Sequence, residues 1–287
     1  MVFIPLLLAG AAATLAGCAA VADSSPGDTR EVVTSFYPLQ FVAERVGGRG
    51  VTVRNLTKPG AEPHDLELSP RDVADLGDAD VVVYLSGFQP AVDTAVDQEA
   101  DDTGYDVGPA ARLDAKDPHF WLDPTRLADV AGALADRLAE VDPAGAADFR
   151  RNAAALRADL AELDTEMSQG LADCASTDLV TSHNAFGYLA NRYGLTQRGI
   201  TGLTPEDEPA PGDLARVADF VEANDVRTIY HEALVSPAIA ATLARETGAR
   251  SALLDPLEGL DASSPGSDYL EVMRANLASL RKGQACR

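Results

Sequence analysis

Two stretches of the chain, VVTSFYPLQFVAERVG at 32–47 and LVTSHNAFGYLANRYG at 179–194, align without a gap. Each begins with a β-branched run, passes through a turn and continues as a helical pattern. A strand-like segment follows each copy at a similar distance, VVVYL at 81–85 and RTIYH at 227–231. Two copies of a strand–helix–strand unit predict an α/β fold of two similar lobes, each a parallel sheet flanked by helices.

A long segment between the two copies, residues 142–173, has a single apolar stripe. Asp142 and Pro143 at its start are typical of a helix N-cap and a first-turn proline. We predict one backbone helix over 142–173, which joins a lobe of residues 30–141 to a lobe of residues 174–287. About 30 residues at 1.5 Å each give roughly 45 Å of helix, longer than one lobe needs. The stripe that faces the core recurs every three or four positions and consists of Phe149, Ala153, Leu156, Leu160, Leu163, Met167 and Leu171.

Residues 1–17 carry no charged side chain and are apolar or small. A run this short predicts a signal peptide rather than a membrane span. It ends in Leu-Ala-Gly-Cys, which resembles the bacterial lipobox, where the cysteine is lipidated and becomes the mature N-terminus. We therefore expect an extracytoplasmic protein, either anchored to the bacterial cell membrane through lipidated Cys18 or periplasmic, with residues 18–29 as a polar tether. A plain signal peptide with a chance cysteine is the alternative.

The other two cysteines, Cys174 and Cys286, lie in neither a CxxC motif nor the neighbourhood of a histidine. Outside the cytoplasm two thiols oxidise where geometry permits, so we expect a structural disulfide between them. The chain has 45 acidic and 23 basic residues, a formal net charge of -22. Phosphate backbones would be repelled at long range, which argues against nucleic acid as a partner.

Three of the four histidines follow predicted strands directly or through a loop. His64 lies in a loop after VTVRNL, and His183 comes directly after LVTS. His119 lies in DPHFWLDP, just before a helix that Asp123 and Pro124 would start. Ligands of α/β proteins bind beyond the carboxyl ends of the strands, so these side chains can converge in a cleft between the lobes. The fourth histidine, His231, is interpreted as structural or surface-exposed.

Imidazole is a good ligand for zinc, copper, nickel and iron, and a tetrahedral zinc site needs four ligands. We expect the fourth ligand to be Asp255 in SALLDPLEG, because it too follows a strand-like run. Glu62 and Glu232 are the alternatives. Ligating histidines usually donate their second N–H to a carboxylate or carbonyl. The candidate acceptors are Asp65, Asp117 and Asp123.

The chain resembles the solute-binding proteins of zinc and manganese ABC importers, in which one long rigid helix joins two lobes. The resemblance covers nearly the whole chain after the tether, and its motifs occur in the family's order and spacing. It implies His64, His119, His183 and Asp255 as metal ligands, an ABC importer permease as partner, and a monomer. The motifs are VTSFYPL, KPGAEPHDLELSPRD, DPHFWLDP, LVTSHNAFGYLANRYGL, TGLTPEDEPAPGDL and LLDPLEG.

The third of these positions bears on the metal. Manganese-binding members of the family resemble this chain but carry glutamate where His183 stands. Three imidazoles favour zinc over the harder manganese ion, which prefers oxygen ligands. The segment 93–117 is acidic and has no histidine, unlike the His-rich loop of many zinc-binding members. We expect zinc as the transported ion, with manganese as the alternative.

Two other functions are compatible with a metal-binding cleft. A secreted zinc metallohydrolase needs an open coordination position and a general base, and the sequence has no HExxH signature. A surface adhesin is a function described for some relatives, but no segment here indicates a host ligand. We therefore expect a metal-binding transport protein and not an enzyme.

Overall fold

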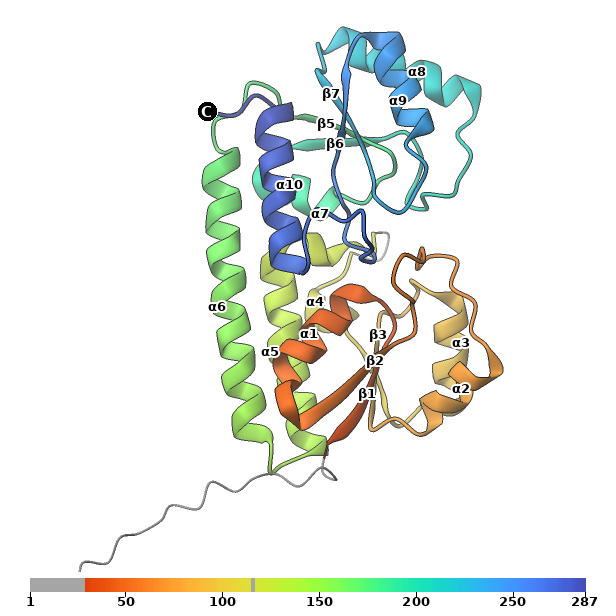
Figure 1. Cartoon of the computed structure of the whole chain (residues 1–287), viewed down its shortest axis with the longest axis vertical. Helices are drawn as coiled ribbons and strands as arrows, with labels where there is room; N and C mark the ends of the chain where they lie inside the picture. The colour runs from red at the N-terminus through yellow and green to blue at the C-terminus, as the bar shows by residue number, and fades with distance from the viewer. Residues whose placement is uncertain (1–28, 115–116) are drawn as a thin grey trace, which may run out of the picture.

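Two parallel β-sheets of four strands each form the two lobes of the protein (Figure 1). The computed structural model describes residues 29–114 and 117–287. The expected signal peptide, and Cys18 with it, lie outside the described residues. The strands of the first sheet are β1 (Arg30–Thr34), β2 (Val51–Asn55), β3 (Val81–Tyr84) and β4 (Gly104–Asp106), and those of the second are β5 (Asp178–Thr181), β6 (Thr196–Gly199), β7 (Thr228–His231) and β8 (Arg250–Leu253).

The two sheets have the same topology. Their strand orders are β2-β1-β3-β4 and β6-β5-β7-β8, and every described pairing is parallel. Val32 of β1 pairs with Val53 and Val81, and Val180 of β5 pairs with Arg198 and Ile229 on its two sides. The first strand of each sequence repeat is therefore a central strand. The prediction of two similar α/β lobes is confirmed.

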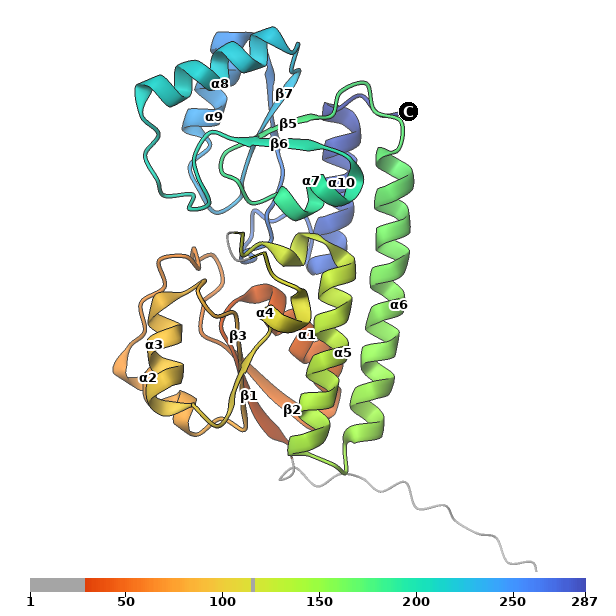
Figure 2. The same ribbon diagram turned by 180° about the vertical axis from the view of Figure 1, so that it is seen from behind.

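Helices cover both faces of each sheet and connect the lobes on one side (Figure 2). Two short 3-10 turns, η1 (Gly48–Gly50) and η2 (Phe120–Leu122), complete the secondary structure of the described residues. The helices are α1 (Tyr37–Gly47), α2 (Pro70–Gly77), α3 (Pro90–Glu99), α4 (Gly108–Ala111), α5 (Pro124–Val141), α6 (Ala146–Leu171), α7 (Gly187–Tyr193), α8 (Pro211–Ala223), α9 (Ala238–Thr247) and α10 (Tyr269–Gly283).

The long helix α6 runs beside both lobes, as the apolar stripe predicts (Figure 1). Every residue of the predicted stripe is buried, and α6 packs against α1, α5 and α10. Its start differs from the prediction, because the helix begins at Ala146 with Gly145 as N-cap. Asp142 instead ends α5, where its N–H donates to Leu138 O at 2.8 Å, and Pro143 lies in the turn between the two helices. Asp123 caps α5 and Pro124 begins it, as expected.

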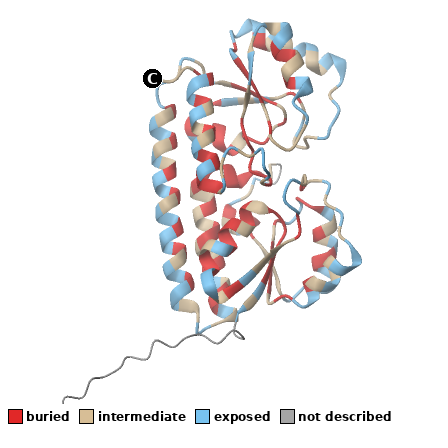
Figure 3. Cartoon of the chain, viewed as in Figure 1, coloured by how far each residue is buried: buried red, intermediate tan, exposed pale blue. Residues whose placement is uncertain are grey.

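One hydrophobic core extends through both lobes. It joins Val32 of the first sheet to Leu179 of the second through the buried faces of α5, α6 and α10. Figure 3 shows buried residues along the faces where these helices meet, with exposed residues on their outer faces. One smaller cluster lies under the outer helices of each lobe. The lobes are therefore packed on a common helical layer rather than joined by a flexible linker.

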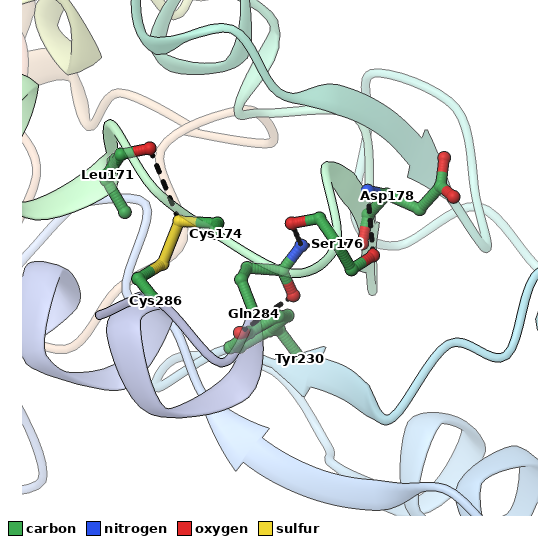
Figure 4. The surroundings of a disulfide bond; sticks show 7 residues. All are labelled: Leu171, Cys174, Ser176, Asp178, Tyr230, Gln284 and Cys286. Carbon is green, nitrogen blue, oxygen red and sulfur yellow. Dashed lines mark hydrogen bonds between the residues drawn. A yellow bond between two sulfur atoms is a disulfide. The ribbon is translucent and has the colours of Figure 1, made fainter.

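The expected disulfide between Cys174 and Cys286 is present (Figure 4). It links the segment after α6 to the segment after α10, 112 positions apart in the sequence. Beside it, the Gln284 side-chain amide donates to Asp178 O at 2.8 Å and to Ser176 O at 3.3 Å. These bonds attach the end of the described chain to the start of β5. Among the described residues, no helix has both the length and the apolar character needed to cross a membrane.

Candidate metal centre

Three histidines and one glutamate converge between the lobes. His64 lies on the loop between β2 and α2, and His119 immediately precedes η2. His183 follows β5 in the second lobe, and Glu258 follows β8. One potential ligand atom from each residue lies within 4.8 Å of all the others. All four side chains come from segments beyond the carboxyl ends of parallel strands, where α/β folds bind ligands.

A single carboxylate oxygen is the centre of this group. Glu258 Oε1 lies 3.1 Å from His64 Nε2, 3.0 Å from His119 Nε2 and 3.2 Å from His183 Nε2. The Nε2 atoms of His119 and His183 are 3.4 Å apart. Among the described residues, this is the group of histidine and acidic side chains whose ligand atoms could share one ion.

The fourth member of the group differs from the expectation, because the structure brings in Glu258 and not Asp255. Asp255 Oδ1 accepts a hydrogen bond from Leu257 N at 2.8 Å, so this carboxylate closes a turn within its own segment. Leu257 then adopts a left-handed conformation with φ of 60°, and Glu258 follows it to the histidines. The two carboxylates are three positions apart in LDPLE, so the sequence motif identifies the right turn but not the side chain that faces the cleft.

Carboxylates on the far side of two imidazoles fix their orientation. His119 Nδ1 lies 2.7 Å from Asp117 Oδ1, as expected for an outer acceptor. His183 Nδ1 lies 2.7 Å from Glu232 Oε2. Glu232, expected as an alternative ligand, therefore orients the imidazole of His183 from its Nδ1 side instead. Each imidazole is left with Nε2 directed at Glu258.

The other acidic candidates have local structural roles. Glu62 Oε2 accepts hydrogen bonds from His64 N at 3.0 Å and from Asp65 N at 3.4 Å, while Glu62 Oε1 is 3.9 Å from His64 Nε2. Glu62 thus holds the His64 loop in shape and borders the group. Asp123 accepts from Thr125 N at 2.9 Å at the start of α5. His231 lies outside the group, with its Nδ1 2.9 Å from Ser251 Oγ.

The electrostatics of the group depend on the proximity of carboxylate and imidazoles. Burial alone would raise the pKa of Glu258, but hydrogen bonds from His119, His183 and His64 hold it well below its ordinary value. Burial alone would lower the pKa of His183, but hydrogen bonds to Glu232 and Glu258 raise it to about 10. Burial would likewise lower the pKa of His119, but hydrogen bonds to Asp117 and Glu258 raise it. A cation that binds here must displace protons from the imidazoles.

Aromatic side chains form the wall of the site on the first lobe. The His64 ring packs against Phe88 with centroids 4.7 Å apart, and the His119 ring against Trp121 at 5.2 Å. Trp121 is fully buried, as expected for core packing. His119 and His183 are completely buried, whereas the side chain of His64 keeps 9% of its surface exposed. His64 is therefore the least buried of the three histidines.

The donor set suits a particular class of ion. Three neutral imidazoles and one carboxylate give four ligands, the usual number for zinc in proteins. Nitrogen-rich sets of this kind favour borderline metals over manganese, magnesium and calcium, which prefer oxygen. The acceptors Asp117 and Glu232 add the outer hydrogen bonds that ligating histidines usually have.

Comparisons with known proteins agree with this chemistry. Residues 32–283 match the family model described as "Zinc-uptake complex component A periplasmic". The zinc-binding protein AdcA of Streptococcus pyogenes serotype M6 is 34% identical over 284 residues, which cover 88% of this chain and 55% of that protein. The chain thus spans about half the length of the curated relatives that it matches first.

Two solved structures are similar over 89% of this chain and 99% of their own. One is the laminin binding protein (Lmb) of Streptococcus agalactiae, with a TM-score of 0.82 and 35% identity. The other is the Zn(II)-bound ZnuA-like domain of Streptococcus pneumoniae AdcA, with a TM-score of 0.77 and 33% identity. The family model covers most of the chain, and the fold is shared throughout. The chain therefore belongs to the family of the zinc-uptake complex component A.

Proposed function

We propose that this chain captures Zn²⁺ in the cleft between its lobes and delivers it to an ABC importer permease. The ligands are His64, His119, His183 and Glu258. The observation that carries the proposal is the convergence of three imidazole nitrogens on one buried carboxylate oxygen. A zinc ion would bind among these atoms, with each imidazole deprotonated at Nε2.

Zinc is preferred to manganese because nitrogen supplies three of the four donors. The names of the relatives support the same ion, since one is a zinc-binding protein and one a Zn(II)-bound domain. Manganese remains the alternative cargo, and the selectivity experiment on His183 described below separates the two. The permease follows from the family description, which makes this chain one component of a zinc-uptake complex.

The place of action is extracytoplasmic, again from the family description. A lipid on Cys18 would hold the monomeric protein beside its permease, with residues 18–29 as tether. Mass spectrometry of the N-terminal peptide from native membranes tests this part. A diacylated Cys18 is the expected result, and an unmodified mature chain would contradict anchoring.

A transport role fits the site better than hydrolysis does. A zinc hydrolase keeps one position open for water and has a general base nearby. Here Glu258 already stands among the three histidines, and the nearby Glu232 and Asp117 are engaged on the Nδ1 side of His183 and His119. The laminin binding protein is described as both an adhesin and a metal transporter, but no contact among residues 29–114 and 117–287 favours adhesion.

Metal analysis and a binding titration test the proposal. Protein purified from its native compartment should contain about one zinc per chain by elemental analysis, since added-metal titrations follow the general affinity order of metals. In competition with a chromophoric chelator, Glu258→Gln should weaken zinc binding more than about tenfold, or 1.4 kcal/mol. Glu222→Gln, an exposed change on α8, is the matched control. Unchanged affinity in Glu258→Gln would contradict the ligand set.

A further inference from the structure

The turn that carries Glu258 is held by buried groups that are not among the four proposed ligands. It consists of residues 255–258 and follows β8. Asp255 and Leu257 are buried, and the turn contains the left-handed residue Leu257. Leucine rarely adopts this conformation, so the surroundings must hold the turn in place. The contacts that do so come from two distant segments of the chain.

The first contact is made by Asn276 on α10. Its side chain is 99% buried, and both ends of its amide bind the same residue. Asn276 Oδ1 accepts from Asp255 N at 2.9 Å, and Asn276 Nδ2 donates to Asp255 O at 2.7 Å. A pair of bonds of this kind fixes the backbone on both sides of Asp255. Oδ1 of the Asp255 carboxylate then accepts from Leu257 N.

The second contact is made by Trp121, two residues after His119. Its indole Nε1 donates to Pro256 O at 2.7 Å, in the middle of the turn. Its own carbonyl accepts from Tyr269 Oη at 2.6 Å, at the start of α10. Trp121 therefore connects the loop of one histidine ligand to the turn of the carboxylate ligand.

We propose that Asn276 and Trp121 are positioning residues of the metal centre: they hold the 255–258 turn in the one conformation that presents Glu258, rather than Asp255, to the three histidines. The inference rests on the proposed function, since it assigns the carboxylate of the same site. Without these bonds the turn can relax from its left-handed residue, and the carboxylate of Glu258 loses its place among the imidazoles.

A double-mutant cycle on zinc affinity tests the inference. The four proteins are the wild type, Asn276→Leu, Glu258→Gln and the double variant, each measured by competition with a zinc chelator. Asn276→Leu should weaken binding roughly 10- to 100-fold, as loss of an outer partner usually does. The further loss caused by Glu258→Gln should be much smaller in the Asn276→Leu background than in the wild type. An equal loss in both backgrounds would overturn the inference.

Two further variants separate positioning from general damage. Asn152→Leu on α6 removes an amide that donates to Val46 O at 3.0 Å, far from the site, and should leave zinc affinity unchanged. Trp121→Phe keeps a ring in the core but removes the N–H, so it provides a second cycle if Asn276→Leu fails to fold. Non-additivity with Glu258→Gln is the expected result here too, and additivity in this cycle would overturn the role of Trp121.

A spectroscopic measurement gives an independent result. The visible absorption of bound Co²⁺ reports the ligands around the metal, and Glu258→Gln should change it strongly in the wild type but little in Asn276→Leu. A wild type that binds no zinc would refute the proposed function itself, and equally tight binding without Glu258 would refute the ligand set and the positioning role with it. Zinc binding that needs Glu258 equally in every background would refute only the positioning role.

Discussion

Individual residues of the site have sharply different tasks even though their chemistry is similar. Asp255 and Glu258 are both buried carboxylates in one turn, yet one closes the turn and the other faces three imidazoles. Glu232 lies within hydrogen-bonding distance of His183 but on its Nδ1 side. The role of each carboxylate is thus set by the backbone that carries it and by the hydrogen bonds it already makes.

Zinc binding should release protons at neutral pH. Protons would compete with metal for an imidazole of ordinary pKa, near 6.5, only in mild acid. Burial would lower the pKa of His183, but its two carboxylate partners raise it to about 10, so below that pH a proton must leave before zinc can bind. As the pH is lowered from about 8 to about 6, zinc affinity should therefore fall by about tenfold per pH unit for each proton released.

Calorimetry in buffers of different ionisation enthalpy measures this proton release. At least about one proton per zinc is expected at neutral pH. His231→Gln, outside the site, should not change the number. A zinc affinity independent of pH across this range, with no proton released, would show that the metal-free imidazoles are neutral.

The identity of the side chain at position 183 should determine the choice of metal. Replacing His183 by Glu exchanges a nitrogen donor for an oxygen donor, and this favours manganese relative to zinc. We expect the ratio of the Mn²⁺ and Zn²⁺ dissociation constants to fall in His183→Glu by more than about tenfold. Competition titrations with both ions measure the ratio. An unchanged ratio would mean that His183 is not a ligand.

The helix α6 and the disulfide Cys174–Cys286 have separate structural roles. The stripe of α6 is buried against α1, α5 and α10, so this helix supports both lobes at once. The disulfide instead closes the second lobe by joining the end of the α6 segment to the segment after α10. Neither element contributes a side chain to the metal site.

Removal of the disulfide should lower stability without lowering zinc affinity. In the chain-entropy model, closing a loop of about 100 residues contributes roughly 4.7 kcal/mol, and the bond here spans 112 positions. A Cys174→Ser, Cys286→Ser double variant should lose about 4 kcal/mol in the free energy of unfolding, measured in urea. Its zinc dissociation constant should match that of the wild type. A weakened affinity would show that the disulfide is coupled to the site.

The whole molecule behaves as two lobes on one core. Because a single hydrophobic cluster includes residues of both sheets and the helices between them, wide opening of the lobes would expose buried apolar surface. Shifts of loops or small displacements of a lobe cost much less. We therefore expect release of the ion to involve the loop of His64, whose side chain is the most exposed of the four proposed ligands.

Solution scattering and hydrogen exchange can test this expectation. The radius of gyration should be nearly the same with and without zinc, while exchange should increase on metal removal in residues 57–69 and 255–258. The amides of α6 should be unaffected. A large increase in radius on chelation would indicate hinge opening and contradict the common core.

Much of this architecture follows from local sequence patterns. The repeat, the stripe of α6 and the caps of α5 each predict an element from short-range periodicity, and those elements form. The three histidines could be predicted for a similar reason, since each lies at or beyond the end of a strand. The sequence predicts the start of the long helix at Asp142, whereas the helix begins at Ala146, because Asp-Pro suits both a helix N-cap and a turn between helices.

Glu258 could not be predicted with the same rules. Whether Asp255 or Glu258 faces the cleft depends on Asn276 and Trp121, which reach the turn from positions 21 and 135 residues away. A local motif contains no information about contacts at that separation. The short strands β4 and β6 lack the apolar or β-branched run that predicts a strand, and they pair with β3 and β5.

The spacing of the ligands along the chain determines when metal can take part in folding. His64 and Glu258 are separated by 194 positions. The proposed site is therefore incomplete until the segment that carries Glu258 is in place. Bringing such distant segments together requires that both sheets and the helical layer have formed. We therefore expect zinc to bind a molecule that is already folded, so that a lack of the ion would leave an empty site rather than a misfolded protein.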